Sequence, residues 1–387
     1  MIKIFHSIKN FFKNSPNLTS LGISSGISNL IGGIFWFYIA SILGTELYGE
    51  VSYLLSIAII GSTISLLGST NTIIVYTAKK IKIQSSIFLV AIVSALVSAS
   101  ILFVLFSESF GISIFVIGYV TFALITSDFL GKKFFVRYSK FIVSQKICQV
   151  VLSILLYYIL GVNGIILGIG LSFIPFGLFI LKEFKISEIN FSLLKTHSGF
   201  MANNYFLDIN RSLEGSIDKI ILAPIIGFSL LGNFQLGVQF LSILTILPVV
   251  VFQYTLPNDA SGTSVLRVKK IVIVFSILLA FLSFILCPLL LPLVFPEYVE
   301  AIIVIQIMSL AIIPFTITTT FTSKFLGFEK SRYVLIGSGI FLIIQISGII
   351  LLGTYFGIIG AAISILIGRI GETVYYFVVD KLQSNKT

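Results

Sequence analysis

Twelve mostly apolar stretches follow one another along this chain, separated by short polar segments. They lie near residues 18–43, 51–77, 84–106, 111–130, 141–160, 162–181, 201–226, 230–256, 269–293, 299–322, 333–353 and 355–378. A helix needs about 20 such residues to cross the hydrocarbon core of a bilayer, where pairing within the helix satisfies the backbone. Only 10% of the residues are charged, against roughly 25% in a soluble domain, so lipid must be the main solvent of the folded chain.

The charges of the short segments indicate an orientation. If the N-terminus is cytoplasmic, 21 of the 25 basic residues lie in inside segments and the outside connections carry none. The outside connections hold Glu46, Glu50, Glu108, Glu297 and Glu300. This asymmetry follows the positive-inside rule at every loop, and a wrong helix count would break it. We therefore predict a multi-pass protein of the cell membrane, with its N- and C-termini in the cytoplasm.

Landmarks of the first half of the chain recur in the second half. Gly44 and Gly49, after the first helix, have the same spacing as Gly227 and Gly232. Two further matches join residues 139–141 (Ser-Lys-Phe) to 331–333 (Ser-Arg-Tyr), and the Gly-Ile-Ile sequence at 164–166 to the one at 357–359. Four landmarks in the same order indicate an internal repeat of six helices.

Because six is an even number, both halves enter the membrane from the same side, which implies parallel repeats about an axis along the membrane normal, a known plan of transporters. We expect an all-α polytopic membrane protein of about twelve helices, arranged as two pseudo-symmetric six-helix bundles around a central cavity. The predicted organisation is an N-terminal lobe at 1–185, a cytoplasmic linker at 186–200 and a C-terminal lobe at 201–387. Gene duplication without transport is the alternative interpretation.

Several chemical classes find no support in the sequence. There is no G-x-x-x-x-G-K-[ST] loop, no H-E-x-x-H or G-x-S-x-G motif, and no connection long enough to fold alone. Cys148 and Cys287 lie in apolar stretches and offer neither a disulfide framework nor a metal site. The net charge of +10 is divided into small clusters, which suits the anionic cytoplasmic leaflet of the membrane lipids better than nucleic acid. We expect no enzyme and no cofactor.

Four basic residues remain inside predicted helices, and these are the strongest candidates for a site: Lys146, Arg211, Lys219 and Arg369. Ionised groups at bilayer depth cost at least a few kcal/mol and normally face a cavity or a partner. Guanidinium and ammonium groups suit a diphosphate. We therefore predict that these cations contact an anionic substrate in the cavity.

Polar residues share a helix face with the cations. On a helical wheel, Asn204, Asp208, Arg211, Asp218 and Lys219 fall within an arc of about 100°. Glu372 lies three residues after Arg369 and therefore beside it. Asn204 would contact sugar hydroxyls, while Asp208, Asp218 or Glu372 could bind a coupling ion, H⁺ or Na⁺. The alternative is that Asp208–Arg211 and Arg369–Glu372 are neutralised structural pairs.

The chain resembles the polysaccharide and O-antigen flippases of the multidrug/oligosaccharidyl-lipid/polysaccharide superfamily, which is MATE-like. The resemblance rests on the G-x-x-x-Y-G pattern from Gly44 to Gly49, the glycine pair after the seventh helix and the Phe-Pro-Glu-Tyr turn at 295–298. It implies two bundles in a V shape and translocation of a polyprenyl-diphosphate-linked glycan to the outer leaflet for surface polysaccharide biosynthesis. In that family the first helix borders the cavity, which adds Asn29 to the candidates.

Three functions stay open at this stage. The first is the lipid-linked oligosaccharide flippase, working by alternating access as a monomer, with polysaccharide-assembly enzymes as possible partners. The second is a multidrug or cation antiporter of the MATE type, for which an acidic, aromatic cavity with few cations would be expected. The third is a membrane-embedded transferase or a scaffold that transports nothing.

Overall fold

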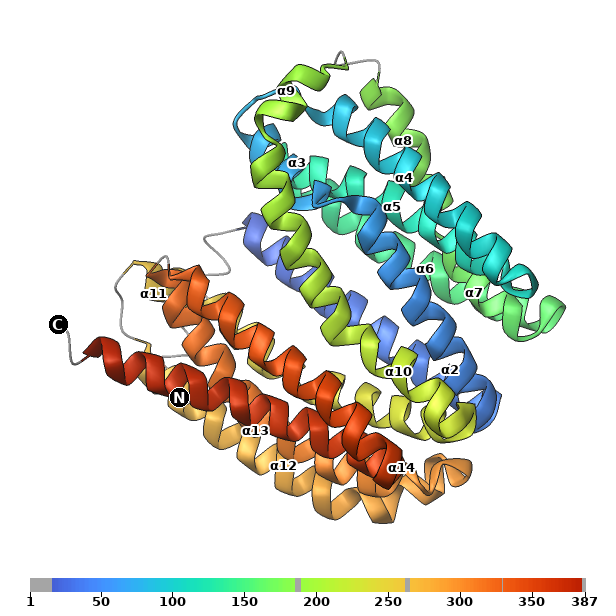
Figure 1. The fold of residues 1–387 in the computed structure, drawn as a ribbon, viewed down its shortest axis with the longest axis vertical. Coiled ribbons are helices and arrows are strands. Elements are labelled where there is room, and N and C mark those ends of the chain that lie inside the picture. Colours follow the sequence, from blue (N-terminus) through green and yellow to red (C-terminus); the bar gives the residue numbers. More distant parts are fainter. Residues whose placement is uncertain (1–15, 185–188, 262–264, 329, 385–387) are drawn as a thin grey trace. The chain divides into compact units, whose positions relative to one another are not determined.

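The computed structural model describes residues 16–184, 189–261, 265–328 and 330–384, and these residues form helices and short connections without a strand (Figure 1). The elements are α2 (Pro16–Leu66), α3 (Ser69–Ala78), α4 (Gln84–Leu105), η1 (Ser107–Ser109), α5 (Gly111–Gly131), α6 (Phe135–Leu160), α7 (Val162–Leu171), α8 (Ile174–Phe184), α9 (Phe191–Thr196), α10 (Ser198–Leu244), α11 (Ile246–Ala260), α12 (Leu266–Val294), η2 (Pro296–Tyr298), α13 (Ala301–Gly327) and α14 (Ser331–Ser384). The extreme termini, which we predict to be cytoplasmic, lie outside the described residues.

The expected helix count is confirmed. Nine helical segments in the described part of the chain are long and apolar enough to cross a membrane. Three of them, in α2, α10 and α14, are each two helices joined at one residue with a non-helical backbone: Gly44, Gly227 and Gly357. Counting each joined pair as two helices gives twelve, and the chain is an all-helical, multi-pass membrane protein.

The internal repeat is visible in the backbone angles. Gly44 has φ 69° and ψ −179°, and Gly227 has φ 78° and ψ 172°. Gly161, between α6 and α7, has φ 64° and ψ −144°, close to the φ 58° and ψ −136° of Gly357. These are left-handed φ values that glycine adopts without a steric penalty. The same kink therefore recurs at the same two places in each half.

Two sequence landmarks of the repeat are out of register, because residues 139–141 correspond to 335–337 rather than to 331–333, and the Gly-Ile-Ile match is shifted by three residues. The Gly-Ile-Ile match pairs Gly164 with Gly357, whereas the kink pairs Gly161 with Gly357 and hence Gly164 with Gly360. A Cβ built on Gly164 would lie 2.0 Å from the carbonyl oxygen of Leu156, and one on Gly360 would lie 2.0 Å from that of Leu352. The two close contacts fix the register, in which α6 corresponds to the first helix of α14.

The chain divides into two compact units that do not follow the sequence halves. Unit 1 comprises residues 1–35 and 57–212, and unit 2 comprises residues 36–56 and 213–387. Both α2 and α10 therefore contribute residues to each unit. The lobes 1–185 and 201–387 describe the repeat in the sequence, and their role as functional bodies stays a prediction.

Unit 1 is built around α5, which packs against α3, α4, α7 and α8. Its core is a cluster of buried apolar side chains that includes Phe88, Val116, Val120 and Leu124. The described part of the predicted linker contains the short helix α9, whose N-cap Asn190 accepts a hydrogen bond from the amide of Leu193 at 2.9 Å. The amide of Asn190 in turn donates to Ser86 of α4 at 2.7 Å, so this segment is docked on unit 1.

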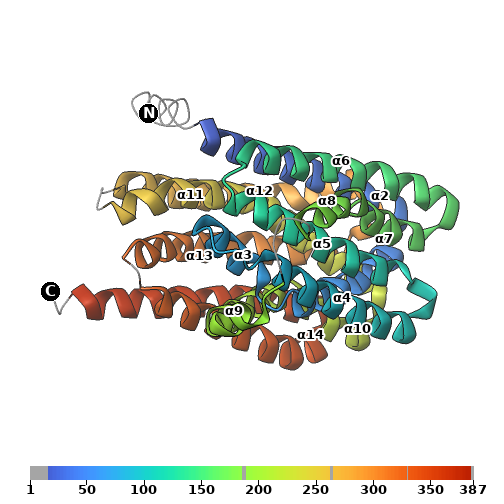
Figure 2. The same ribbon diagram turned by 90° about the horizontal axis from the view of Figure 1, so that it is seen from above.

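In unit 2, α13 takes the place that α5 has in unit 1. Helix α13 packs between α12 and α14, as Figures 1 and 2 show, and it also contacts α11. The segment 36–56 is fastened to this unit by Tyr298, whose hydroxyl lies 2.8 Å from the carbonyl oxygens of both Ala40 and Gly44. Burial raises the pKa of Tyr298 above its ordinary value, so the hydroxyl keeps its proton and remains a donor.

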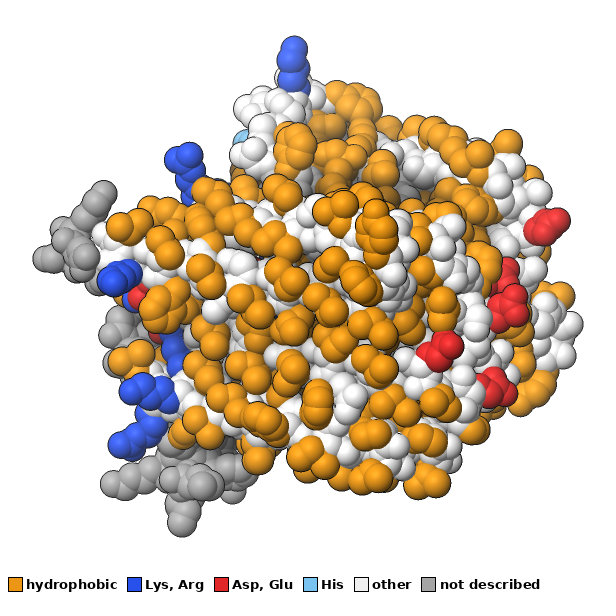
Figure 3. Space-filling view, turned by 60° about the horizontal axis from the view of Figure 1, so that its bottom comes forward, with side chains coloured by type: hydrophobic (Ala, Val, Ile, Leu, Met, Phe, Trp, Pro, Cys, Tyr) orange, Lys and Arg blue, Asp and Glu red, His pale blue; other side chains and the backbone are white. Residues whose placement is uncertain are grey.

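The ends of the spanning helices differ in charge. Figure 3 shows a face covered mostly by hydrophobic side chains, with Lys and Arg toward its left edge and Asp and Glu toward its right edge. Helix α12 begins beside Arg267 and Lys270 and ends just before Glu297. Helix α13 runs the other way, beginning after Glu300 and ending at Gly327, with Lys324 in its last turn. The helix bounds are thus consistent with the charge alternation in the sequence.

Candidate functional site

Unit 2 contains a cavity of about 170 Å³ that gathers several of the candidate residues. It lies among α10, α13 and the two helices of α14. The side chains that matter for its chemistry are Glu214, Asp218, Phe315, Phe341, Gln345 and Arg369. Three of the predicted site residues, Asp218, Arg369 and Glu372, therefore lie at or beside one polar cavity.

Arg369 is held in place by two carboxylates and two aromatic rings. Its Nη1 lies 2.8 Å from Oε2 of Glu372, and its Nη2 lies 3.6 Å from Oε2 of Glu214. Its guanidinium carbon lies 3.5 Å from the ring centroid of Phe341 and 5.3 Å from that of Phe315. Planar guanidinium groups stack on aromatic faces and form forked bonds to carboxylates. The pair with Glu372, which the sequence left open, is formed, and Glu214 is a second partner that it did not indicate.

Asp218 and Lys219 form a buried ion pair within α10. The Lys219 Nζ lies 3.0 Å from Oδ1 of Asp218 and donates to the carbonyl of Gly215 at 2.8 Å. The two side chains are 6% and 4% exposed, so the ammonium group does not reach the surface. Asp218 lines the cavity and Lys219 does not. The carboxylate of Asp218 is thus partly neutralised by its neighbour.

Gln345 is a site residue that the sequence analysis missed. Its side chain is 1% exposed and lines the cavity, and its Oε1 is buried without a hydrogen-bond partner in the described part of the chain. In the corrected repeat register Gln345 corresponds to Gln149 of α6, which is also buried. That correspondence is the signal that could have identified it.

In unit 1, Lys146 belongs to a hydrogen-bonded group on α6. Its Nζ donates to Oε1 of Gln149 at 3.0 Å, and Gln145 donates to the hydroxyl of Ser172 at 2.9 Å. The ammonium group is half-buried and forms no ion pair within the described residues. The partner of Lys146 is thus a neutral amide and not a carboxylate of the described residues.

The predicted polar face of α10 is divided between the two units. Asp208 and Arg211 belong to unit 1, while Asp218 and Lys219 belong to unit 2. Asp208 accepts a hydrogen bond from Thr70 at 3.2 Å. Arg211 is exposed, and no ion pair joins it to Asp208 or to another carboxylate of the described residues. The Asp208–Arg211 pair that the sequence offered as an alternative is thus not a direct ion pair, although the two charges interact electrostatically.

Two neutral candidates have different surroundings. Asn204 is buried and its side-chain amide donates to the carbonyl of Phe200, one helical turn earlier, at 2.9 Å. That bond occupies one of its two donor hydrogens. Asn29 is exposed on α2 in unit 1. Asn29 and Arg211 thus present polar groups on the surface of unit 1, whereas Asn204 is turned inward.

The two units differ in the balance of charges inside their spanning helices. Around the unit 2 cavity there are three carboxylates, Glu214, Asp218 and Glu372, for the two cations Lys219 and Arg369. The mid-helix residues of unit 1 instead comprise Lys146 and Arg211 against Asp208. Unit 2 is suited to a small cation or a proton, and unit 1 is suited to an anion. Among the described residues no group of three His, Cys, Asp or Glu side chains is placed to hold a metal ion.

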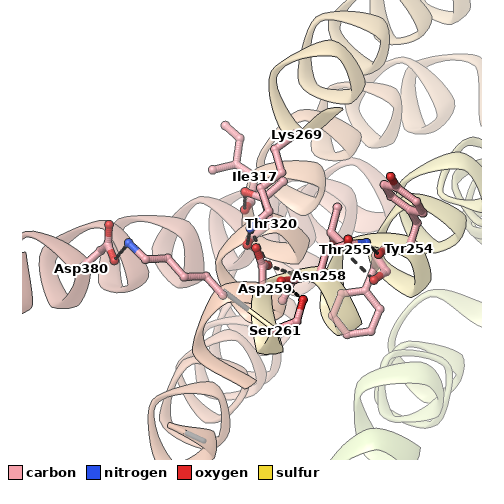
Figure 4. Close-up of polar contacts among 12 residues, drawn as sticks. Tyr254, Thr255, Asn258, Asp259, Ser261, Lys269, Ile317, Thr320 and Asp380 are labelled. Atoms are coloured by element: carbon pink, nitrogen blue, oxygen red, sulfur yellow. Dashed lines mark hydrogen bonds and ion pairs between the residues drawn. The ribbon is translucent and has the colours of Figure 1, made fainter. Parts of the chain in front are cut away.

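A second buried ion pair joins three helices at the basic end of unit 2 (Figure 4). Lys269 of α12 lies 2.6 Å from Oδ2 of Asp259 in α11, and it also donates to the carbonyl of Thr320 in α13 at 3.3 Å. Ser323 donates to the same carboxylate, while Lys324 pairs with Asp380 of α14 at 2.5 Å. Lys269 is 8% exposed although it lies near the start of α12. These contacts tie α11, α12, α13 and α14 together.

A larger cavity of unit 2, about 440 Å³, is almost wholly apolar. It lies along the outer part of α12, from Leu282 to Phe295, and Phe37 and Phe240 complete its wall. These two rings are in edge-to-face contact with centroids 5.0 Å apart. A cavity of this composition can accept hydrocarbon and offers little to a polar group.

The chain has the fold of membrane transporters of known structure. It matches the lipid II flippase MurJ in an inward closed conformation with a TM-score of 0.76 at 14% identity, covering 93% of this chain and 87% of that one. It matches an inward-facing multidrug resistance MATE family transporter of the MOP superfamily with a TM-score of 0.70 at 14% identity, covering 92% and 94%. A MOP superfamily transporter from Pyrococcus furiosus gives a TM-score of 0.57 at 15% identity, covering 94% and 92%.

No protein-family model and no curated protein matches the chain. At 14–15% identity, the structural matches establish the fold, which is that of transporters and flippases. Which substrate such a fold carries here is a question for the residues of the site.

Proposed function

We propose that this protein is a flippase of the MOP superfamily that moves a polyprenyl-diphosphate-linked oligosaccharide from the cytoplasmic to the outer leaflet of the cell membrane. In this proposal both termini are cytoplasmic and the product serves surface polysaccharide assembly. The fold shared with MurJ, which is described as a lipid II flippase, supports a lipid-linked substrate. The fold shared with MATE transporters supports transport in general.

The observation that carries the proposal is the exposed position of Arg211 deep within the first helix of α10. This residue lies 13 positions after the start of α10, a rise of about 20 Å, which is deep in the span of a bilayer. It is exposed and forms no direct ion pair with a carboxylate of the described residues, although it interacts electrostatically with Asp208. Because an arginine facing lipid at that depth is costly, we infer that it faces water and a polar substrate. A guanidinium group donates two parallel bonds to a phosphate, so a diphosphate suits it.

Lys146 and the exposed Asn29 add a second cation and an amide to the same unit. In this assignment the diphosphate binds to residues of unit 1, and Lys146 and Arg211 are its partners. Arg369 and Lys219, which the sequence also assigned to the substrate, serve instead to balance carboxylates in unit 2.

The unit 2 cavity has the chemistry of a coupling site. The carboxylates around this cavity outnumber the cations by one, and the Oε1 of Gln345 has no hydrogen-bond partner among the described residues. Both features favour uptake of one proton or one Na⁺. Glu214, Asp218 and Glu372 are the carboxylates involved. Binding a cation there would neutralise the excess charge, which is expensive to leave in a low-dielectric site.

The MATE-type antiporter is the second candidate, and the unit 2 cavity is the observation that favours it. That cavity is acidic on balance and its wall includes Phe315 and Phe341, a combination that suits an organic cation. Arg369 lies over Phe341 and competes for that ring, which weighs against this candidate.

The test is to delete the gene in the native cell and to measure lipid-linked glycans and surface polysaccharide by mass spectrometry. We expect a polyprenyl-diphosphate glycan to accumulate and its surface polymer to disappear. The wild-type gene should restore export, Arg211→Gln should not, and Arg211→Lys should restore a small part of it. Unchanged glycans with raised sensitivity to cationic drugs would refute the flippase and support the antiporter.

A further inference from the structure

The connection between α5 and α6 forms a small hollow lined by cations and apolar groups. Its volume is about 380 Å³, and its walls are Lys133, Phe134, Phe135, Val136, Arg137 and Lys140. All three basic side chains are exposed, and Phe134 and Val136 are 47% and 53% exposed. We call it the α6 pocket. No part of the proposed transport site uses it.

Among the described residues, no carboxylate forms an ion pair with the cations of the α6 pocket. Asp128, the nearest acidic residue in the sequence, is buried and already pairs with Lys132 at 2.7 Å. Arg137 lies over the rings of Phe129 and Phe134, 5.5 Å from each centroid, which holds its guanidinium group beside the pocket. Three positive side chains therefore line one hollow without an ion-pair partner in the described part of the chain.

The backbone at the start of α6 adds donors to the same place. The amides of Phe135, Val136 and Arg137 open the helix, and in the described part of the chain none of them donates to a backbone carbonyl or to a capping side chain. The first amides of a helix and its positive dipole end favour an anion. These donors supplement the three side chains that line the pocket.

The second repeat provides an internal comparison. In the corrected register, Phe129 corresponds to Phe325 and Arg137 to Tyr333, and the cation–ring contact of unit 1 is replaced by a ring–ring contact with centroids 5.7 Å apart. Two of the basic residues near that second position are already used, because Lys324 pairs with Asp380 and Lys330 donates to Gln383, while Arg332 is exposed. The two repeats therefore differ here in the contact made by the ring at 129 and 325, which is to a cation in the first repeat and to a ring in the second.

We propose that the α6 pocket binds the phosphate of an anionic membrane lipid in the leaflet at the basic ends of the helices, with Lys133, Arg137 and Lys140 as its partners. The exposed Phe134 and Val136 lie beside these cations and would contact the hydrocarbon chain of the same molecule. A soluble phosphate would gain nothing from those two side chains. The assignment to the cytoplasmic leaflet rests on the orientation proposed above, but binding itself does not depend on transport.

The test is lipid binding to the purified full-length protein in detergent, measured by native mass spectrometry. The probes are phosphatidylglycerol, phosphatidylcholine, a polyprenyl diphosphate and inorganic pyrophosphate. A basic residue near a membrane surface contributes roughly a factor of five in affinity for an anionic lipid. We expect Arg137→Gln to weaken phosphatidylglycerol binding roughly fivefold, and the combination of K133Q, R137Q and K140Q to weaken it roughly a hundredfold.

The matched control is the combination of K330Q and R332Q at the corresponding place of the second repeat, which should leave binding unchanged. If the triple variant is poorly folded, the test uses two single variants, Arg137→Gln, which removes the charge, and Arg137→Lys, which keeps it.

Tighter binding of the polyprenyl diphosphate than of phosphatidylglycerol would identify the transported class of lipid as the occupant. Equal binding of the two would identify a resident phospholipid. The proposal is overturned if the pocket variants bind like the wild type, or if phosphatidylcholine or pyrophosphate binds as tightly as the anionic lipids. Neither result depends on whether the protein translocates a glycan.

Discussion

At the scale of single residues, the arginines inside the spanning helices have different surroundings and therefore different roles. Arg369 lies between Glu372 and Glu214 and stacks on Phe341, whereas Arg211 is exposed and has no direct ion pair among the described residues. The sequence places both at bilayer depth but does not say which partners they find. Glu214 precedes Arg369 by more than 150 positions, and such a pair forms only after α10 and α14 have packed together.

The geometry around Arg369 predicts an order of destabilisation. Removing one partner of a buried pair outright costs about 3–5 kcal/mol, and Arg369 keeps a second carboxylate in either variant, so each substitution costs less than this. We expect Glu372→Gln to lower the unfolding temperature more than Glu214→Gln, because the Glu372 contact is 2.8 Å rather than 3.6 Å and its side chain is 5% rather than 19% exposed. Thermal unfolding of the purified variants checks this order. Lys270→Gln, at an exposed position, is the control, and an equal or larger effect of Glu214→Gln would contradict the geometry.

At the scale of elements, the sequence predicts where the chain spans the membrane but not how neighbouring spans are joined. Long apolar stretches and alternating charges are enough to locate twelve helices within a few residues. The connections expected at 44–50 and 227–229 are each a single glycine, after which the helix resumes at once. Breaks at residues 67–68, 172–173 and 245 interrupt stretches that the sequence reads as continuous. Hydropathy reports burial in lipid and is insensitive to a local change of backbone direction.

The register of the repeat also needed the structure, because it is set by close contacts between backbones. In unit 2, a Cβ built on Gly49 would lie 2.0 Å from the carbonyl oxygen of Phe228, and one built on Gly232 would lie 1.8 Å from that of Thr45. Thr45 and Phe228 are themselves equivalent in the repeat, each following its kinked glycine. The contact is therefore reciprocal, as expected where two copies of one motif meet around a pseudo-twofold axis.

This contact predicts which glycines tolerate alanine. Gly49→Ala and Gly232→Ala place a methyl group against a backbone carbonyl that cannot move aside, so we expect loss of folded protein. Gly339→Ala is the matched control, since nothing lies within 4 Å of its Cβ position and alanine favours a helix over glycine by about 1 kcal/mol. The yield of monodisperse protein in size-exclusion chromatography is the measurement. Normal yields of the first two variants would refute the reciprocal contact.

At the scale of the whole molecule, the fold could be predicted from the sequence, whereas the distribution of charges between the two units could not. The all-helical transporter fold follows from the sequence and is confirmed, since a hydrophobic pattern of this kind has few alternatives in a bilayer. The separation of an acidic cavity in unit 2 from free cations in unit 1 could not be predicted. It depends on which unit each part of α10 joins, and that boundary falls between Ser212 and Leu213 without any signal in the composition.

The central claim is that the protein moves an anionic lipid-linked glycan and that Arg211 is needed for this movement. The most direct measurement is translocation of a fluorescent polyprenyl-diphosphate oligosaccharide in proteoliposomes that contain the purified protein. The account predicts that the wild type makes the inner-leaflet pool accessible to a membrane-impermeant quencher, whereas Arg211→Gln, reconstituted at the same density, does so at least tenfold more slowly. If wild type and variant translocate the lipid equally, or if the wild type only exchanges an organic cation for H⁺ or Na⁺, the claim is contradicted.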